Sequence, residues 1–334
     1  MAGANSAETL EDAAVRSAEQ LAADVRAAKA AISAVIFGQE RVIDNTLVTI
    51  LAGGHALLIG VPGLAKTKLV ETLGTTLGLD AKRIQFTPDL MPSDILGAEV
   101  LDEASSGRRS FRFIAGPVFA QLLMADEINR ASPRTQSALL QAMQEQHITV
   151  AGARHDLPRP FHVLATQNPL EQEGTYPLPE AQLDRFLMQI DVDYPDRDAE
   201  RRILFETTGA DEAKAKPAIT AEALMSAQRL VRRLPVGDSV VEAILSLVRS
   251  ARPGPDAGDL GEAIAWGPGP RASQSLMLAV RARALLDGRL APSIDDVLEL
   301  AEPILKHRMA LTFAARAEGR TIADIIGRLK ARIG

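Results

Sequence analysis

The chain has 334 residues and a net charge of −6 at pH 7, and 46% of its residues are hydrophobic. This length is enough for two domains, and the composition is that of a globular protein rather than of a disordered one. The absence of cysteine excludes disulfides and thiol chemistry and favours a reducing compartment, so we expect a cytoplasmic protein. No apolar run reaches the roughly 18 residues of a membrane-spanning helix. Acids and bases are interspersed, which disfavours nucleic acid as a partner.

The N-terminal part is predicted to be helical after a short tail. Residues 1–8 are interpreted as a loose tail, and apolar residues at helical spacing predict a helix over 9–34. A break at 36–40 separates this helix from a second one over 41–52.

A loop rich in glycine and proline then joins a predicted buried strand, 55–59, to a predicted helix, 68–73. The loop consists of Gly60, Val61, Pro62, Gly63, Leu64, Ala65, Lys66 and Thr67, and Lys68 follows it. A strand, such a loop and a Lys-Thr pair at a helix start are the context of a phosphate-binding P-loop.

The chemistry of this loop follows from its backbone. Free N–H groups and the helix dipole favour an anion there. Lys66 would contact the β- and γ-phosphates of ATP, and the Thr67 hydroxyl would hold Mg²⁺. The glycine usual before the lysine is Ala65 here. We place Ala65 in right-handed geometry at the helix start and therefore expect the loop to tolerate it.

The segment between the loop and residue 190 alternates strands with other elements. Strands are predicted over 83–86, 118–125, 161–166 and 187–190, and helices over 133–146 and 180–186. Hairpins are predicted within 97–116, with a turn at 104–107, and around 148–152.

Polar residues at strand ends supply the candidate catalytic groups. Asp126 and Glu127 end the buried segment 118–125, where ligands bind in open α/β sheets. Asp126 would hold the Mg²⁺ shell, and Glu127 would polarise the attacking water as general base. Asn168 follows another buried strand and could position that water, and Arg185 ends a short helix.

From about Pro195 onward, helical patterns replace the strand patterns. Helices are predicted over 217–234, 239–251, 271–287, 293–312 and 320–331. The expected fold is therefore an α/β P-loop NTPase core with a parallel sheet, followed by an all-α lid domain. We divide the chain into an N-terminal tail and helix (1–30), the core (31–195) and the lid (196–334).

These residues resemble the MoxR family of AAA+ ATPases. The resemblance covers roughly residues 30–312, and the matching segments are 60–67, 85–94, 126–133, 136–144, 165–169 and 183–186. It implies that Asn168 is sensor 1, that Arg185 is an arginine finger for the neighbouring subunit and that Arg271 is sensor 2. It also implies that Gly38 and Gln39 lie near adenine and that the two hairpins point toward a central pore.

The resemblance implies a ring-forming, chaperone-like motor that hydrolyses Mg-ATP. Such a ring, expected to be a homo-hexamer, would remodel or mature a client protein complex or assist insertion of a metal or cofactor into it. Its partner would be a separate protein with a von Willebrand factor A domain. The sequence does not name the client.

Alternative functions are a chelatase-type or nucleic-acid-remodelling motor of the same branch, a P-loop small-molecule kinase, and a switch that binds ATP without useful hydrolysis. Hydrolysis that needs no phosphoryl acceptor would distinguish a motor from a kinase. The combination of Lys66, Asp126, Glu127 and Arg185 argues against a switch that does not hydrolyse ATP.

Overall fold

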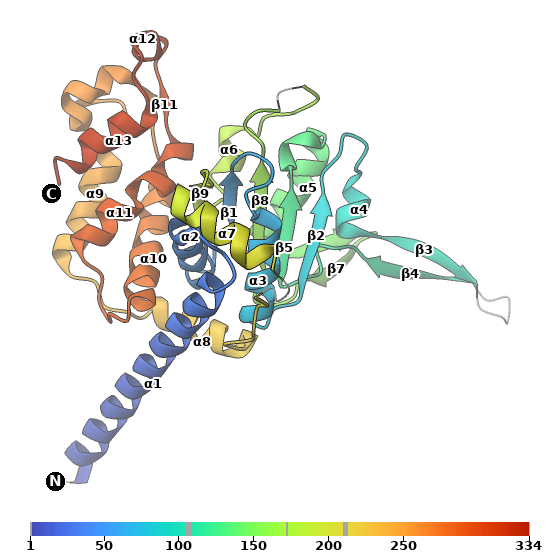
Figure 1. Cartoon of the computed structure of the whole chain (residues 1–334), viewed down its shortest axis with the longest axis horizontal. Helices are drawn as coiled ribbons and strands as arrows, with labels where there is room; N and C mark the ends of the chain where they lie inside the picture. The colour runs from blue at the N-terminus through green and yellow to red at the C-terminus, as the bar shows by residue number, and fades with distance from the viewer. Residues whose placement is uncertain (1, 104–108, 172, 210–212, 334) are drawn as a thin grey trace.

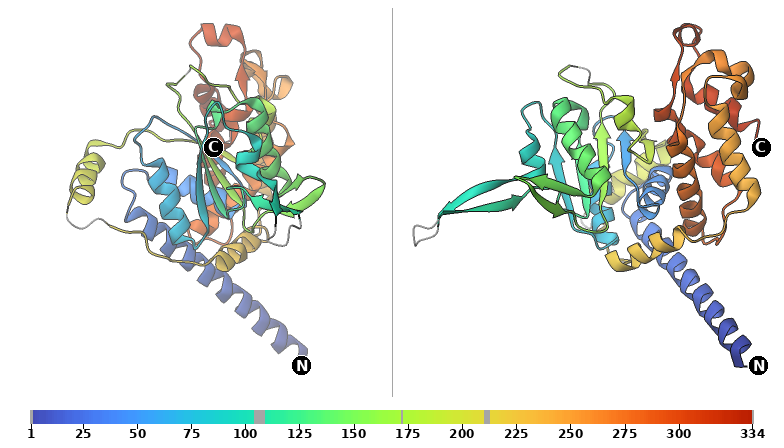
Figure 2. Two further views of the ribbon diagram at one scale, coloured as in Figure 1. Left: turned by 90° about the vertical axis from the view of Figure 1, so that its right-hand side faces the viewer. Right: turned by 180° about the vertical axis from the view of Figure 1, so that it is seen from behind.

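The computed structural model describes residues 2–103, 109–171, 173–209 and 213–333. Figure 1 shows an α/β part with a central sheet, a helical C-terminal part beside it and a long N-terminal helix that extends away from both. Figure 2 shows the same arrangement from the side and from behind. None of the helices among the described residues is long and apolar enough to cross a membrane.

The central sheet of the described residues has five parallel strands in the order β2-β5-β8-β1-β9. These strands are β1 (Ala56–Ile59), β2 (Ala81–Gln85), β5 (Leu122–Asp126), β8 (His162–Gln167) and β9 (Met188–Asp191). From β1 the chain crosses to the edge strand β2, and it finally returns to β9 on the other side of β1. Ligands usually bind at the carboxyl ends of the strands beside such a reversal.

Alternation along the strands places side chains in two separate cores. One face, with Leu58 and Met124, packs against the N-terminal helices and continues into the C-terminal part. The other face, with Leu57 and Leu123, packs against α4 and α5. The helices of this part are α2 (Glu40–Leu51), α3 (Lys66–Thr76), α4 (Pro92–Leu96), α5 (Pro133–Glu145) and α6 (Glu180–Leu183), with the 3₁₀ turn η1 (Ile128–Arg130). Because both faces are covered, the inner strands β1 and β5 are almost continuously apolar, whereas the edge strand β2 is mostly polar and exposed.

Both predicted hairpins are present. β3 (Gly97–Glu103) pairs antiparallel with β4 (Arg109–Ala115), and β6 (His147–Val150) pairs with β7 (Ala153–Asp156). The predicted turn at 104–107 lies outside the described residues. The β3–β4 hairpin projects from the α/β part (Figure 1), and its Phe111 is 71% exposed.

The N-terminal helix is longer than predicted. α1 spans Ala2–Ser33, so the interpretation of residues 1–8 as a loose tail is wrong from residue 2 onward. Alanine and other good helix formers in this stretch let the helix extend to its start. In its C-terminal half, Val25 and Ile32 are buried against the rest of the protein.

The C-terminal part is mainly helical. Its elements are α7 (Arg197–Thr207), α8 (Ala221–Val231), α9 (Asp238–Ser250), η2 (Pro255–Ala263), α10 (Pro270–Leu286), α11 (Ile294–Leu305), η3 (Lys306–Arg308), α12 (Phe313–Ala317) and α13 (Ile322–Lys330). A short antiparallel pair, β10 (Ile264–Trp266) with β11 (Ala310–Leu311), accompanies the helices and was not predicted. The predicted helix 293–312 was therefore too long, because the chain leaves the α-helix at Leu305 to form η3 and then this strand pair.

Candidate active site

A cleft of about 490 Å³ lies at the carboxyl ends of the central strands. Its lining residues come from the P-loop and from strands β2, β5 and β8: Pro62, Gly63, Leu64, Ala65, Lys66, Thr67, Lys68, Arg83, Gln85, Asp126, Glu127, Thr166 and Asn168. The register brings these strand ends together, because Gln85 lies opposite Asp126 and Leu58 lies opposite Thr166. The sequence-predicted P-loop, acidic pair and Asn168 thus surround one cavity.

The P-loop folds closely onto the neighbouring chain. A Cβ on Gly60 would lie 2.5 Å from the carbonyl oxygen of Val192, so only glycine fits there without a shift. The Lys66 ammonium donates to the carbonyl oxygens of Gly60 and Val61, at 3.2 Å for the latter. Burial lowers the pKa of Lys66, and the negative charges of Asp126 and Glu127 oppose that shift. In this conformation the Lys66 ammonium donates its hydrogen bonds to carbonyl oxygens of its own loop.

The backbone conformation of Ala65 differs from the one that we predicted from the sequence. It precedes α3 with φ 55° and ψ 21°, in the left-handed region rather than the right-handed geometry that we expected. The loop must reverse direction before the helix starts, and this fixes the sign of φ. A left-handed non-glycine residue costs roughly 1 kcal/mol, so the loop carries strain that a glycine would lack.

Asp126 is buried and held on both carboxylate oxygens. Arg83 of β2 donates to Oδ2 through Nη2 at 2.6 Å and through Nε at 3.1 Å. Thr166 of β8 donates its hydroxyl to Oδ1 at 2.5 Å. Neither Arg83 nor Thr166 was predicted as a site residue. Both reach Asp126 because the strand order places β5 between β2 and β8.

Glu127 also adopts left-handed backbone geometry, with φ 55° and ψ 50°. Its carboxylate accepts a hydrogen bond from Gln85 Nε2 at 2.6 Å and lies 3.2 Å from Arg130 Nη1. Its backbone N–H donates to the Thr166 hydroxyl at 2.9 Å. A non-glycine residue in this region costs about 1–3 kcal/mol and is typical of functional sites. Gln85 and Arg130 therefore restrain the carboxylate of Glu127, the expected general base, in one orientation.

Asn168 lines the cleft directly after β8. Its carbonyl oxygen accepts a hydrogen bond from the Leu170 N–H at 3.1 Å, and its amide lies 3.5 Å from Glu171. These contacts fix the side chain at the rim of the cleft. The amide lies where it could orient water near a bound phosphate chain.

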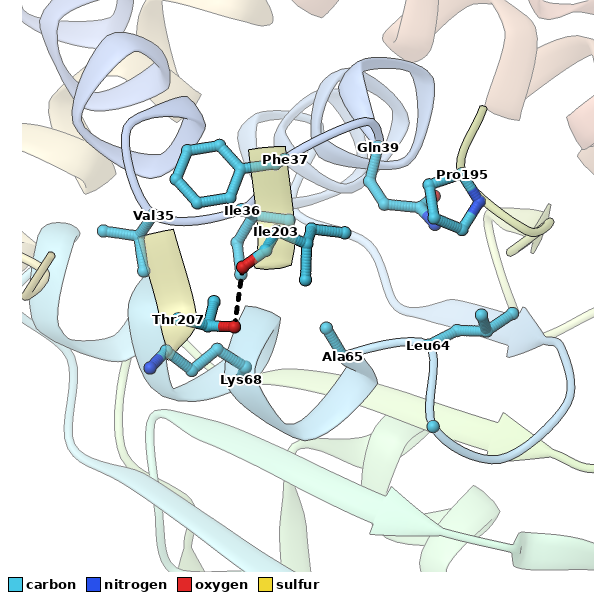
Figure 3. Close-up of a pocket in the computed structure, with 11 residues that line it drawn as sticks. Val35, Ile36, Phe37, Gln39, Leu64, Ala65, Lys68, Pro195, Ile203 and Thr207 are labelled. Atoms are coloured by element: carbon cyan, nitrogen blue, oxygen red, sulfur yellow. Dashed lines mark hydrogen bonds between the residues drawn. The ribbon is translucent and has the colours of Figure 1, made fainter. Parts of the chain in front are cut away.

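A second cavity of about 280 Å³ adjoins the phosphate cleft. The two cavities share Gly63, Leu64, Ala65 and Lys68. The remaining lining residues of the second cavity are Val35, Ile36, Phe37, Gln39, Pro195, Ile203 and Thr207. Figure 3 shows these side chains around the pocket, with the apolar groups of the α1–α2 connection facing α7. A mainly apolar pocket next to a phosphate site has the character of a base-binding pocket.

Of the two residues predicted near adenine, Gln39 lines this pocket and Gly38 does not. Gln39 donates its amide to the carbonyl oxygen of Asp193 at 2.9 Å. Gly38 has φ 67°, and a Cβ there would lie 2.4 Å from the Cβ of Ala199. Gly38 thus permits the close approach of α7, which forms one wall of the pocket.

The two predicted arginines lie elsewhere. Arg185 and Arg271 line a cavity of about 90 Å³ together with His55, Met143 and Gln144. We call this the arginine cavity. It lies at the amino ends of the strands, because His55 precedes β1 and Arg185 precedes β9. Strand β1 alone spans about 13 Å at ~3.3 Å per residue, so these arginines lie across the sheet from the P-loop cleft of the same chain.

The two arginines differ in their contacts. Arg271 Nη1 lies 3.3 Å from Asp184 Oδ2. Among the described residues, the side chain of Arg185 has no hydrogen-bond or ion-pair partner. An unpaired guanidinium beside a second, half-exposed one is suited to an anion that arrives from outside the subunit.

The donor set of the cleft fits Mg²⁺. Thr67, Asp126 and Thr166 present hydroxyl and carboxylate oxygens, the ligand atoms that this hard cation prefers. Mg²⁺ commonly uses one or two protein oxygens together with phosphate oxygens and water. Arg83 would have to release Asp126 Oδ2 before that oxygen could face a metal ion or its water shell.

The comparisons with known proteins agree with this geometry. Residues 55–188 match the model of the ATPase family associated with various cellular activities (AAA), and residues 259–329 match the AAA lid domain. The chain is 41% identical over 332 residues to Chaperone MoxR1 of Mycobacterium tuberculosis, and the alignment covers 98% of this chain and 87% of the relative. It is 32% identical over 306 residues to protein MoxR of Paracoccus denitrificans, which covers 86% of this chain and 88% of the relative.

A solved structure gives the same result. The crystal structure of a candidate ATPase from Cytophaga hutchinsonii superposes with a TM-score of 0.88 at 36% identity and covers 95% of this chain and 96% of that one. The sequence matches and the structural match extend over both the α/β part and the helical part. The chain is therefore an ATPase and belongs to the MoxR family of AAA+ ATPases.

Proposed function

We propose that this ATPase is a ring-forming motor in which each active site is shared between two subunits. One subunit supplies the P-loop cleft and the base pocket for Mg-ATP. Its neighbour supplies Arg185 and Arg271 to the γ-phosphate. The functional units would be the core over 31–195 and the lid over 196–334, and the expected ring is a homo-hexamer.

The observation that carries this proposal is the separation of the predicted catalytic residues. Lys66, Asp126 and Glu127 line the cleft, whereas Arg185 and Arg271 line the arginine cavity across the sheet. A subunit's own arginines are thus remote from its own phosphate site. An arrangement with the cleft of one copy against the arginine cavity of the next uses the same pair of surfaces at every interface, and a ring closes such a head-to-tail contact.

The contacts of the two acidic residues support a site that becomes active only when a neighbouring subunit completes it. Gln85 and Arg130 hold the Glu127 carboxylate, and Arg83 holds Asp126. For hydrolysis, Glu127 must turn to accept a proton from the attacking water, and Asn168 must orient that water. Positive charge from the neighbour's Arg185 would stabilise the charge that develops on the phosphoryl oxygens.

The exposed β3–β4 hairpin supports work on a client protein. Leu101, Phe111 and Ile114 are exposed apolar residues on this hairpin. We propose that the hairpins face the ring pore and contact a client complex, which the motor remodels or matures, or into which it assists insertion of a metal or cofactor. A separate protein with a von Willebrand factor A domain would link the motor to this client.

The experiment that tests the shared site is Mg-ATP hydrolysis against protein concentration, with the mass of the assembled species measured alongside. We expect turnover per subunit to rise steeply as the ring forms. Turnover that is independent of concentration in a monomer would contradict the proposal. It would favour the kinase or switch alternatives, and hydrolysis without any phosphoryl acceptor would then exclude the kinase.

A further inference from the structure

Arg308 is a buried charged residue that lines neither the P-loop cleft nor the arginine cavity. It ends the 3₁₀ turn η3 after the lid helix α11, and it is 2% exposed. Burial lowers the pKa of its guanidinium, and the hydrogen bond to Asp184 opposes that shift. A buried guanidinium is costly unless its N–H groups are satisfied, so the residues around Arg308 are arranged to accept from it.

The acceptors lie on both sides of Arg185. Arg308 Nε donates to Asp184 Oδ1 at 2.7 Å, and Nη2 donates to the carbonyl oxygens of Asp184 at 3.3 Å and Phe186 at 2.6 Å. Nη1 donates to the carbonyl oxygen of Leu187 at 3.2 Å. One side chain from the lid therefore fixes the backbone immediately before and after Arg185, whose own side chain has no partner within the described part of the chain.

Asp184 connects the same arginine to the second member of the arginine cavity. Its Oδ1 accepts from Arg308, and its Oδ2 lies 3.3 Å from Arg271 Nη1. Arg271 lies in the first turn of the lid helix α10. A single carboxylate thus sets the relative positions of the lid helix α10 and of the loop 184–187, which carries Arg185 and which we call the finger loop.

The rest of η3 makes parallel contacts. Lys306 Nζ lies 2.5 Å from Asp191 Oδ2 at the end of β9, and His307 Nε2 lies 3.1 Å from the carbonyl oxygen of Phe186. All three residues of η3 therefore contact the segment from Asp184 to Asp191. Any shift of the lid end of α11 would be transmitted to the loop that carries Arg185.

We propose that Arg308 is a positioning residue that fixes the direction of Arg185 and Arg271 and makes that direction depend on how the lid is docked. The inference rests on the shared active site proposed above. The lid of one subunit then controls the site of its neighbour, because the finger loop can hold its geometry only while Arg308 occupies this place.

The test uses the full chain with Arg308→Lys, Arg185→Ala and the combination of both. Lysine retains the charge, but it offers one ammonium group in place of a guanidinium that reaches three backbone carbonyls of the loop. With a misplacement of about 1 Å, we expect Arg308→Lys to lower kcat about 10²-fold. The KM for ATP, the affinity for a fluorescent ATP analogue and the assembled mass should stay within about twofold of wild type.

The combined variant separates positioning from general loss of stability. If Arg308 acts mainly through Arg185, the fold-loss of kcat from Arg308→Lys should fall from about 10²-fold to less than about tenfold in the Arg185→Ala background, and the part that remains acts through Arg271. Asp184→Asn, with nearly the same shape as aspartate, serves as a second variant and should show the same dependence. Arg283→Lys is the matched control, because Arg283 joins the lid to α2 through Asp44 without contacting the finger loop.

Two outcomes would overturn the inference. One is a normal kcat for Arg308→Lys and Asp184→Asn while Arg185→Ala is slow. The other is an equal fold-loss from Arg308→Lys with and without Arg185. If Arg185→Ala itself hydrolyses ATP normally, the shared site fails first, so failure of the inference and failure of the proposed function give different results.

Discussion

The P-loop cleft and the arginine cavity differ in nearly every physical respect although one sheet builds both. The cleft lies at the carboxyl ends of the strands, and its charged groups already bond to one another: Lys66 to loop carbonyls, Asp126 to Arg83, and Glu127 to Gln85 and Arg130. The arginine cavity lies at the amino ends, and Arg185 in it has no side-chain partner among the residues that the structure describes.

The P-loop cleft and the arginine cavity therefore differ in which of their charged side chains already have partners. The cleft is closed by internal contacts that a bound nucleotide must replace. In the arginine cavity, Arg308 holds the backbone on both sides of Arg185. Under the proposed function each of these two sites is incomplete, and contact with a second copy would make one complete site from them.

The largest expected effect comes from the arginine cavity. Arg185→Ala should lower kcat about 10³–10⁵-fold, which is the contribution of arginine fingers in related phosphoryl-transfer reactions. Its affinity for ATP and its assembly should stay at the wild-type level, because the residue is remote from its own cleft. Steady-state hydrolysis and nucleotide titration would check this. Arg233→Ala, at an exposed position just after α8, is the control, and equal turnover of both variants would contradict the role of Arg185.

The matching change in the cleft should be somewhat smaller. Glu127→Gln removes the general base, which contributes about 10²–10⁴-fold, and leaves the remainder of the site intact. ATP should bind and persist in assembled rings, as measured by nucleotide content after gel filtration. Glu71→Gln, an exposed change on α3, should behave as wild type. Rapid release of ADP by Glu127→Gln would remove Glu127 from the base role.

Acid should destabilise the arginine side of the sheet more than the cleft. Burial lowers the pKa of His55 to about 3 and that of His162 to about 4, and it lowers the pKa of His307 well below 6.5. His55 lines the arginine cavity, and His307 contacts the carbonyl oxygen of Phe186 next to Arg185. None of the three lines the P-loop cleft.

The lowered pKa values determine the direction in which the free energy of unfolding changes with pH. Between pH 6.5 and the folded pKa, the unfolded chain binds more protons, so the stability present above pH 6.5 is lost as the pH falls. Each imidazole should then reduce the free energy of unfolding by about 1.4 kcal/mol per pH unit. Denaturant titrations at several pH values would measure this slope. His162→Gln should make this slope shallower, and an unchanged slope in His162→Gln would contradict the assignment.

The smallest expected effect concerns the strained P-loop. Ala65→Gly should raise the free energy of unfolding by up to about 1 kcal/mol, because glycine adopts a positive φ without the steric cost. Ala151→Gly is the matched control, since Ala151 also has a positive φ, 47°, but lies in the β6–β7 turn. Both variants should be stabilised in thermal unfolding, and only Ala65→Gly should alter ATP affinity. Destabilisation by both would show that the backbone strain is not what limits stability here.

The sequence predicted best those features that are continuous in the chain. The P-loop, the acidic pair and both hairpins are local patterns, and each is present where it was expected. The order of the strands was not predictable from such patterns, so Arg83, Gln85 and Thr166 were missed although each touches Asp126 or Glu127. Their contacts depend on which strands become neighbours.

Other differences arise because tertiary structure decides the local geometry. The sign of φ at Ala65 is set by the reversal of the loop, which local propensity does not reveal. The sequence alone does not distinguish Val35 and Ile203 from other apolar residues. They form pocket walls only because α7 folds over the α1–α2 connection. A sequence signal did exist for Arg185: it lies just before a predicted strand, and that position indicates the amino edge of the sheet.

The most direct test of the shared active site is a mixture of two inactive variants. Lys66→Ala loses the cleft but keeps the arginines, and Arg185→Ala keeps the cleft but loses the finger. Each alone should hydrolyse ATP poorly. In randomly mixed rings about a quarter of the interfaces join an intact cleft to an intact finger, so roughly a quarter of wild-type turnover should return. No recovery in rings shown to contain both variants would contradict a site shared between subunits.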